Sequence, residues 1–153
     1  MATGRRYHGY AAGTNTVSTT APLSNQVSAT TVRPKVYEFI IGSDATPADT
    51  GNKFSLQRTT ANFGTPSAVT PNPLDPADPA SLCLFSKPGG TAPTITANSD
   101  MLWIAINGRA NFRWVASPDG EIGLPATAAN GLCLTSVVAT TAQNWAWSQY
   151  WSE

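Results

Sequence analysis

The stretch that decides the fold is Met101–Pro125, which reads MLWIAINGRANFRWVASPDGEIGLP. It holds runs of strand-forming residues separated by two turn signals, Asn107–Gly108 and Pro118–Gly120. An Asn-Gly pair between apolar runs predicts a β-hairpin, because the tight turn needs positive φ at both central residues. A Pro-Asp-Gly turn followed by the run 121–124 predicts a second hairpin. The stretch therefore predicts a three-stranded meander at the centre of the fold.

The first predicted hairpin has two faces, because successive residues of a strand point to opposite sides. One face is apolar and is predicted to be core; its members are Met101, Trp103, Ala105, Ala110, Phe112 and Trp114. The other face is mixed, with Leu102, Ile104, Ile106, Arg109, Asn111 and Arg113. Arg109 and Arg113, with Arg58 at the end of another predicted strand, suit bidentate pairing with carboxylates across an interface. The other interpretation is that they are solvated surface arginines.

Further runs have the alternation or the β-branched and aromatic content of strands. They cover residues 32–41, 53–60, 81–86, 131–138 and 143–152. None has helical periodicity, and Gly- and Pro-rich turns lie between them. This pattern predicts an all-β fold, a single β-sandwich or jelly-roll-like domain over residues 32–153. The connection Ala61–Pro79 holds five prolines, and a connection of that length is usually functional or interfacial.

The beginning of the chain differs in composition. Met1–Thr31 is rich in Ser, Thr and Ala, has no charged residue after His8 and has few large apolar side chains. Such a segment lacks the apolar surface for a core of its own. We therefore expect an extended N-terminal arm over residues 1–31 that neighbouring chains hold in place. The residues with enough reach to anchor it are Arg5, Arg6, Tyr7, His8 and Tyr10.

The overall composition limits the partners. The chain has 153 residues, of which 12% are charged, with nine basic and nine acidic side chains. An average soluble domain has about 25% charged residues, so we expect part of this surface to be covered by other proteins. A net charge of zero offers no field that attracts nucleic acid or an anionic membrane. No apolar run approaches the roughly 18 residues of a transmembrane helix.

Enzyme signatures are missing from the sequence. His8 is the one histidine, and no nucleophile elbow, phosphate loop or metalloprotease motif is present. The acidic pairs Asp44/Asp49 and Asp75/Asp78 lie in loops, where Asp usually serves as a turn residue. We therefore predict a protein that is not an enzyme and needs no cofactor or metal.

The two cysteines lie in Leu-Cys-Leu contexts within strand-like runs. We predict that Cys83 and Cys133 are free, buried thiols, although their spacing does not exclude a disulfide. Three tryptophans of the last run, Trp145, Trp147 and Trp151, share one face. They predict either a flat platform for stacking sugar rings or one face of the core, and we favour the core.

The residues around the first turn signal resemble a known family. The run Gly108–Ala116, followed by Pro118, Gly120, Glu121, Pro125–Ala128 and Asn130–Leu132, is similar to small capsid decoration (cement) proteins of tailed bacteriophages. Arg58–Thr60 and Pro73–Pro76 fit the same pattern, and the resemblance covers residues 36–153.

The resemblance implies a β-sandwich or jelly roll without catalytic residues that assembles in the bacterial cytoplasm. It also implies a homo-oligomer, commonly a trimer, that sits on the outer capsid surface of the virion and clamps adjacent major capsid subunits. The other functional hypothesis is a carbohydrate-binding or host-adhesion module of a head fibre or tail.

Overall fold

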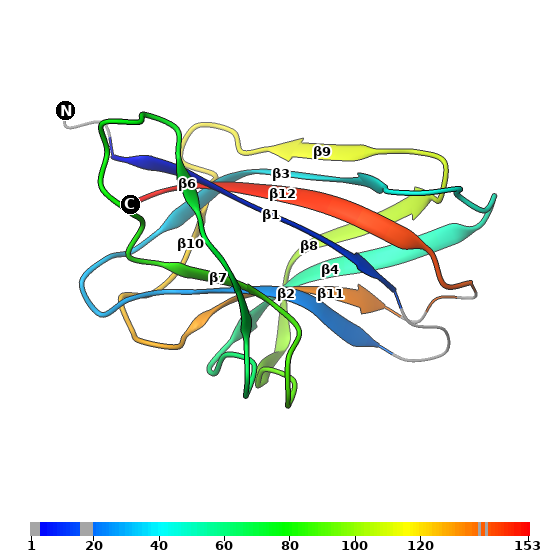
Figure 1. Cartoon of the computed structure of the whole chain (residues 1–153), viewed down its shortest axis with the longest axis horizontal. Coiled ribbons are helices and arrows are strands. Elements are labelled where there is room, and N and C mark those ends of the chain that lie inside the picture. The colour runs from blue at the N-terminus through cyan, green and yellow to red at the C-terminus, as the bar shows by residue number, and fades with distance from the viewer. Residues whose placement is uncertain (1–3, 16–19, 138, 140) are drawn as a thin grey trace.

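The computed structural model describes residues 4–15, 20–137, 139 and 141–153. The described residues form two antiparallel sheets of six strands each, which pack face to face as a β-sandwich (Figure 1). The predictions of an all-β fold and of a sandwich are therefore confirmed.

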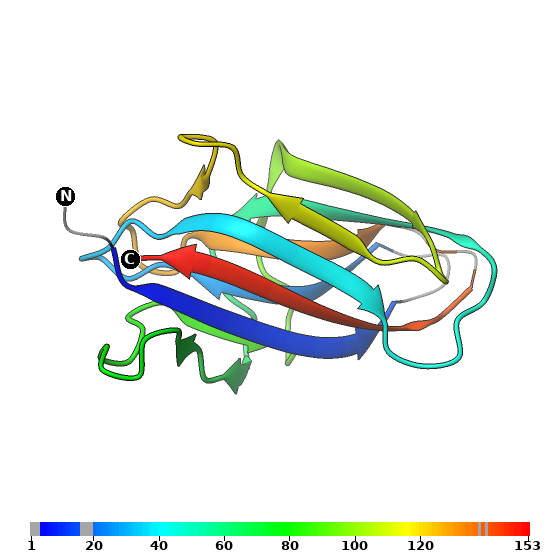
Figure 2. The same ribbon diagram turned by 90° about the horizontal axis from the view of Figure 1, so that it is seen from above.

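The first sheet has the strand order β10-β3-β12-β1-β6, and β9 also pairs with β3. Its strands are β1 (Arg6–Thr14), β3 (Lys35–Ser43), β6 (Asn72–Pro73), β9 (Phe112–Val115), β10 (Ile122–Gly123) and β12 (Asn144–Ser152). Seen from above, β1, β12, β3 and β9 lie side by side across this layer (Figure 2).

The second sheet has the order β5-β7-β2-β11-β4-β8. Its strands are β2 (Ala21–Val27), β4 (Gly51–Thr59), β5 (Ser67–Val69), β7 (Leu84–Lys87), β8 (Ile95–Asn107) and β11 (Gly131–Val137). Apart from the short strands β5, β6, β7 and β10, the two sheets have the orders β9-β3-β12-β1 and β8-β4-β11-β2. This strand order is the two-Greek-key arrangement of jelly rolls.

The core lies between the sheets and is built around the tryptophans of β12. Trp145 and Trp151 have no exposed surface, and the Phe54 ring of the second sheet meets Trp145 edge-on at 4.9 Å between centroids. The Trp147 indole nitrogen donates a hydrogen bond of 2.9 Å to Ser24 Oγ, and Gln149 donates to Gln26. These polar contacts join the sheets across the core and give the buried Ser24 Oγ and Gln26 Oε1 atoms a hydrogen-bond partner.

The predicted meander is wrong. β8 pairs with β4 in the second sheet, whereas β9 pairs with β3 in the first. A turn does form here, but one residue later than predicted: Ala110 N donates to Asn107 O at 3.0 Å, so Gly108 and Arg109 are its central residues. Neither Asn107 nor Gly108 has the positive φ that the predicted turn needs. The turn carries the chain from one sheet to the other. β9 and β10 follow each other along β3 instead of pairing with each other.

The predicted core face is also wrong in its first half. Ile104 is buried, whereas Met101 and Trp103 are exposed, so β8 turns its Leu-Ile face inward. In the second half, Phe112 and Trp114 pack against the core as predicted. Both faces of 101–106 are apolar, and a shift of one residue exchanges them.

The predicted separate arm is wrong for the part of 1–31 that the structure describes, and residues 1–3 and 16–19 lie outside it. β1 lies between β12 and β6, and β2 lies between β7 and β11, so both belong to the sandwich. Apart from Tyr7, the inward residues of β1 are small, and large side chains from other strands fill the space. A Cβ on Gly9 would lie 2.9 Å from the Phe85 ring, and a Cβ on Gly13 would lie 3.3 Å from Trp147.

Cys83 and Cys133 are free and buried, in agreement with the prediction. Burial raises the pKa of both thiols, that of Cys133 to about 12. Both side chains therefore remain protonated, and the thiolate is the form that reacts.

Candidate binding groove

Strand register fixes which side chains of the first sheet point outward, because directly paired residues share a face. The register places them in rows that cross the strands. The first row is Val115, Glu38, Tyr150 and His8; the second is Arg113, Ile40, Ser148 and Tyr10; the third is Gly42, Ala146 and Ala12. The outer face thus passes from aromatic residues at one end to very small residues at the other.

Four rings form a continuous series, which we call the aromatic row: Tyr37, Tyr150, His8 and Tyr10. The His8 ring stacks on Tyr150 at 4.5 Å and on Tyr10 at 5.7 Å between centroids. Tyr37 lies 6.3 Å from Tyr150, and the Arg6 guanidinium stands 5.8 Å from the Tyr37 centroid. At the end of the row, Tyr10 exposes 55% of its surface.

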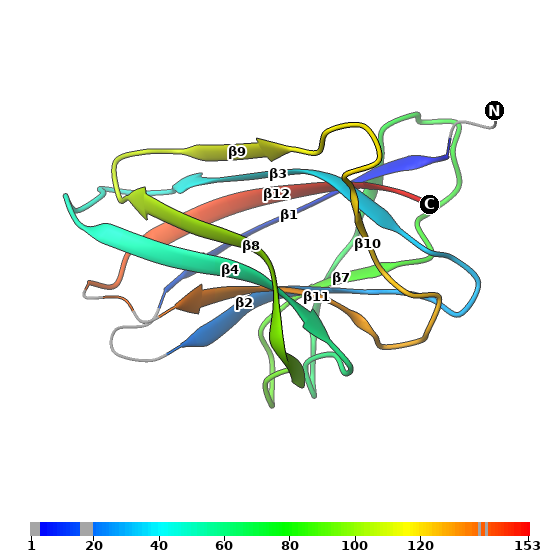
Figure 3. The same cartoon turned by 180° about the vertical axis from the view of Figure 1, so that it is seen from behind.

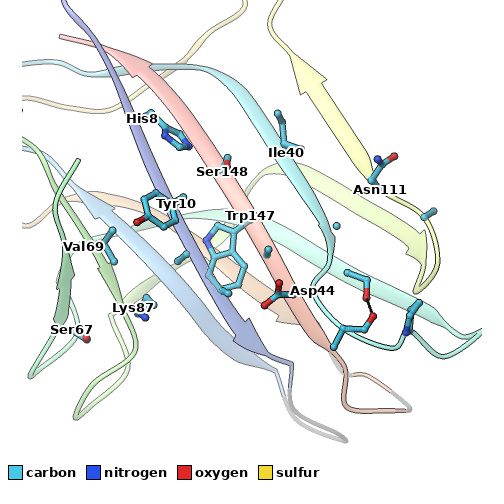
Figure 4. Close-up of a pocket in the computed structure, with 18 of the residues that line it drawn as sticks. His8, Tyr10, Ile40, Asp44, Ser67, Val69, Lys87, Asn111, Trp147 and Ser148 are labelled. Atoms are coloured by element: carbon cyan, nitrogen blue, oxygen red, sulfur yellow. Dashed lines mark hydrogen bonds between the residues drawn. The ribbon is translucent and has the colours of Figure 1, made fainter. Parts of the chain in front are cut away.

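A groove of about 1240 Å³ lies next to Tyr10 over the small residues (Figure 4). Its floor contains Gly42, Ala146 and Ala12, which leave room above the middle of the sheet. One wall comes from β5 and β7 and includes Val69 and Lys87. The opposite wall comes from the β3–β4 and β8–β9 loops, and its polar residues include Asp44, Arg109 and Asn111.

The groove is polar and carries charged side chains of both signs. Lys87 stands on one wall, and Asp44 and Arg109 stand on the other. Burial lowers the pKa of His8, so the imidazole is neutral at pH 7. Its Nε2 atom is buried and has no hydrogen-bond partner among the described residues. The site therefore offers a flat aromatic edge together with hydrogen-bonding groups of both signs.

Five of the eight predicted site residues meet on this outer face: Arg6, His8, Tyr10, Arg109 and Arg113. His8, Tyr10 and Arg109 line the groove itself. Arg113 Nε donates to Glu38 Oε1 at 2.6 Å, so this arginine pairs within the chain.

The other three predicted site residues lie elsewhere. Tyr7 points into the core, where its hydroxyl donates to Pro79 O at 3.1 Å, so it is not the surface anchor that we predicted. Arg5 lies 3.7 Å from the Asp78 carboxylate. Arg58 lies on β4, and its Nη1 donates to Gly123 O at 2.9 Å. The structure does not bring Arg58 together with Arg109 and Arg113.

The three tryptophans of β12 do not form the platform for sugar rings that the sequence left open. Trp145, Trp147 and Trp151 are buried, so the prediction that they form core is confirmed. The opposite face of the same strand carries Ala146, Ser148 and Tyr150, and it is this face that borders the groove or the aromatic row.

Sequence reasoning missed several residues of the groove. Tyr150 and Ala146 follow from the alternation in β12, once the tryptophan face is assigned to the core. Lys87 and Val69 carry no such signal, because β7 and β5 reach the groove through an insertion between β4 and β8.

Among the residues that the structure describes, no cluster of three or more His, Cys, Asp or Glu side chains is placed to hold a metal ion. No helix there is long and apolar enough to cross a membrane.

The fold and the groove thus define a β-sandwich with a polar, aromatic-edged binding surface. No known protein family, curated protein or solved structure matches the chain.

Proposed function

We propose that the chain is a structural virion protein, a capsid decoration (cement) protein. It binds the outer capsid surface as a homo-oligomer, a trimer by resemblance, and bridges major capsid subunits without catalysis. The resemblance of residues 36–153 supports this function, as does the low charge of the chain. The observation that carries the proposal is the exposed apolar edge at β8.

β8 is an edge strand of 13 residues. Within residues 4–15, 20–137, 139 and 141–153 it pairs with β4 and with no other strand (Figure 3). Long edges invite pairing with other chains, and proteins usually protect them with Lys, Pro or bulges. The regular part of β8, Leu102–Asn107, has no charged residue, no proline and no register shift. The edge is therefore open to a partner strand.

Two large apolar side chains are exposed at this edge. Trp103 exposes 55% of its surface on the outer face of the second sheet, and Met101 lies beside it on the same strand. Exposed apolar side chains that lie side by side mark protein interfaces, and tryptophan is enriched among the residues that carry most of the binding energy of an interface.

The proposed mechanism is burial of this edge between subunits. Pairing of backbone groups along β8 and burial of Trp103 and Met101 join one copy to the next or to the shell. β1 and β2 play no part as a free arm, because both strands belong to the body. The contacts come from the sandwich itself.

The experiment measures oligomer mass by native mass spectrometry and co-sedimentation with shells assembled without the protein. We expect the wild type to form oligomers and to sediment with the shells. Trp103→Asp places a charge on the edge and should weaken self-association at least about tenfold, which corresponds to about 1.4 kcal/mol. Tyr10→Ala is the matched control, since Tyr10 is equally exposed on the opposite face. A wild-type monomer that never sediments with the shells would contradict the function.

A second function is supported by a different observation. A carbohydrate-binding or host-adhesion role fits the groove beside Tyr10, because jelly rolls occur in lectins as well as in capsid proteins.

A further inference from the structure

We infer that the groove on the outer face of the first sheet is a binding site for a neutral oligosaccharide. The site is made of the floor Gly42, Ala146 and Ala12, the exposed ring of Tyr10 and the polar groups of both walls. It is independent of the capsid assignment, because the open edge residue Trp103 lies on the outer face of the other sheet.

The shape of the site fits a chain-like ligand. The small floor residues come from β3, β12 and β1, three neighbouring strands. Neighbouring strands are about 4.8 Å apart, so the floor crosses about 10 Å of the sheet. The two walls rise at opposite ends of this floor, from β5 and β7 on one side and from the β8–β9 loop on the other. A short oligosaccharide can lie along the floor between them.

The aromatic side chains fit sugar rings. An aromatic ring offers a flat apolar face together with a polar group at its edge, and a pyranose ring has an apolar face of C–H groups. Tyr10 is held in place by its stacking on His8, and His8 is held by Tyr150. Because this stack fixes the ring while 55% of Tyr10 stays exposed, little side-chain entropy remains to be lost on binding.

The polar groups fit hydroxyls. The Asp44 carboxylate accepts hydrogen bonds, Lys87 and Arg109 donate them, and the Asn111 amide does both. A hydroxyl group is both donor and acceptor, so it can use all of these groups. Two positive side chains and one negative side chain on separate walls provide no single cluster for a phosphate or an acidic peptide. The lack of a cluster of one charge therefore favours a neutral, polyhydroxylated ligand over an ionic one.

The test uses the full chain on a printed array of neutral and acidic glycans, followed by calorimetric titration of the best ligand. We expect neutral oligosaccharides to bind. Tyr10→Ala should weaken binding by about tenfold, since an aromatic contact contributes up to about 1.5 kcal/mol. Trp103→Ala is the matched control, because it removes an equally exposed ring from the other face. It should leave the affinity per site in the calorimetric titration unchanged, even where it weakens self-association.

A second variant fills the groove without removing a ring from it. Ala146→Tyr adds a large side chain that points outward in the middle of the floor, a position that strands tolerate. We expect it to keep the melting temperature of the wild type and to lose glycan binding.

Three results would overturn the inference. They are an array without signal above the Tyr10→Ala baseline, a preference for acidic glycans, and wild-type affinity in the Ala146→Tyr variant. Capture of a peptide in place of a glycan would assign the groove to a protein partner and would also contradict it. None of these results bears on self-association through β8, so the two proposals fail separately.

Discussion

The two long sides of the sandwich end differently. On the closed side, the insertion between β4 and β8 adds β6 beyond β1 and adds β7 and β5 beyond β2. On the open side, β8 and β9 end the two sheets, and no further strand covers β8 among the described residues. The same insertion that covers the closed side also provides one wall of the groove. Under the two proposals, the extra strands on the closed side help to form a site for a small ligand, and the open side is available to a protein.

The largest expected effect tests whether the closed side is part of the body. Deleting residues 1–31 removes β1 and β2, which lie inside the two sheets. We expect the truncated chain not to fold, since the loss exceeds the roughly 5–15 kcal/mol by which a domain is stable. Circular dichroism and a thermal melt check this.

A truncated chain that melts cooperatively with β-sheet content would contradict it. That result would support the prediction of an N-terminal arm, and β1 and β2 would then not be needed for the rest of the sandwich to fold.

The second effect compares two tryptophans of opposite exposure. Trp145 is fully buried between the sheets, and Trp103 exposes 55% of its surface on the open side. Trp145→Ala should lower the free energy of unfolding by about 3–5 kcal/mol. Trp103→Ala should change it by no more than about 0.5 kcal/mol. Urea denaturation at protein concentrations low enough to keep the chain monomeric measures both.

Equal losses in the free energy of unfolding for the two variants would show that Trp103 is packed in a core. The open side would then not have the exposed tryptophan on which the comparison rests. A loss for Trp103→Ala that grows with protein concentration would instead support the interface at β8, because oligomerisation then contributes to the measured stability.

The closed and open sides also differ in how far the sequence predicts them. The alternation of tryptophans in residues 143–152 identifies β12 and its buried face, because large and small side chains alternate there. The segment 6–14 has no such signal. Its Gly9 and Gly13 face the core beneath Phe85 and Trp147, so the apolar surface that holds β1 belongs to other strands. Composition counts only the segment's own residues and therefore predicts an arm.

The error on the open side has a different origin. Asn107–Gly108 correctly marks where the chain turns, although the turn is centred on Gly108 and Arg109. A local signal does not tell a hairpin from a connection between two sheets. The faces of 101–106 are both apolar, so the pattern does not say which faces the core. The groove was predictable in part: Arg109, His8 and Tyr10 come from the sequence, whereas the wall at Lys87 depends on where the insertion packs.

The smallest expected effect concerns the Glu153 carboxylate, which accepts hydrogen bonds from residues on the closed side. Glu153 accepts hydrogen bonds from Ser81 Oγ, from the backbone nitrogens of Leu82 and Cys83 and from the Trp151 indole, and so holds the segment leading into β7. Burial by itself would raise the pKa of this carboxyl group, but the hydrogen bonds outweigh burial, and the pKa is lowered. A lowered pKa means that the stabilisation is present above the unfolded value, about 4.3, and is lost as the pH falls through the folded value.

Glu153→Gln should therefore cost about 1 kcal/mol of stability at pH 7, and the difference from the wild type should shrink at pH 3. Thermal melts at the two pH values measure it, with Glu121→Gln on the open side as the control that accepts none of these bonds. A difference between Glu153→Gln and the wild type that stays the same at both pH values would show that the charge of Glu153 does not hold the closed side.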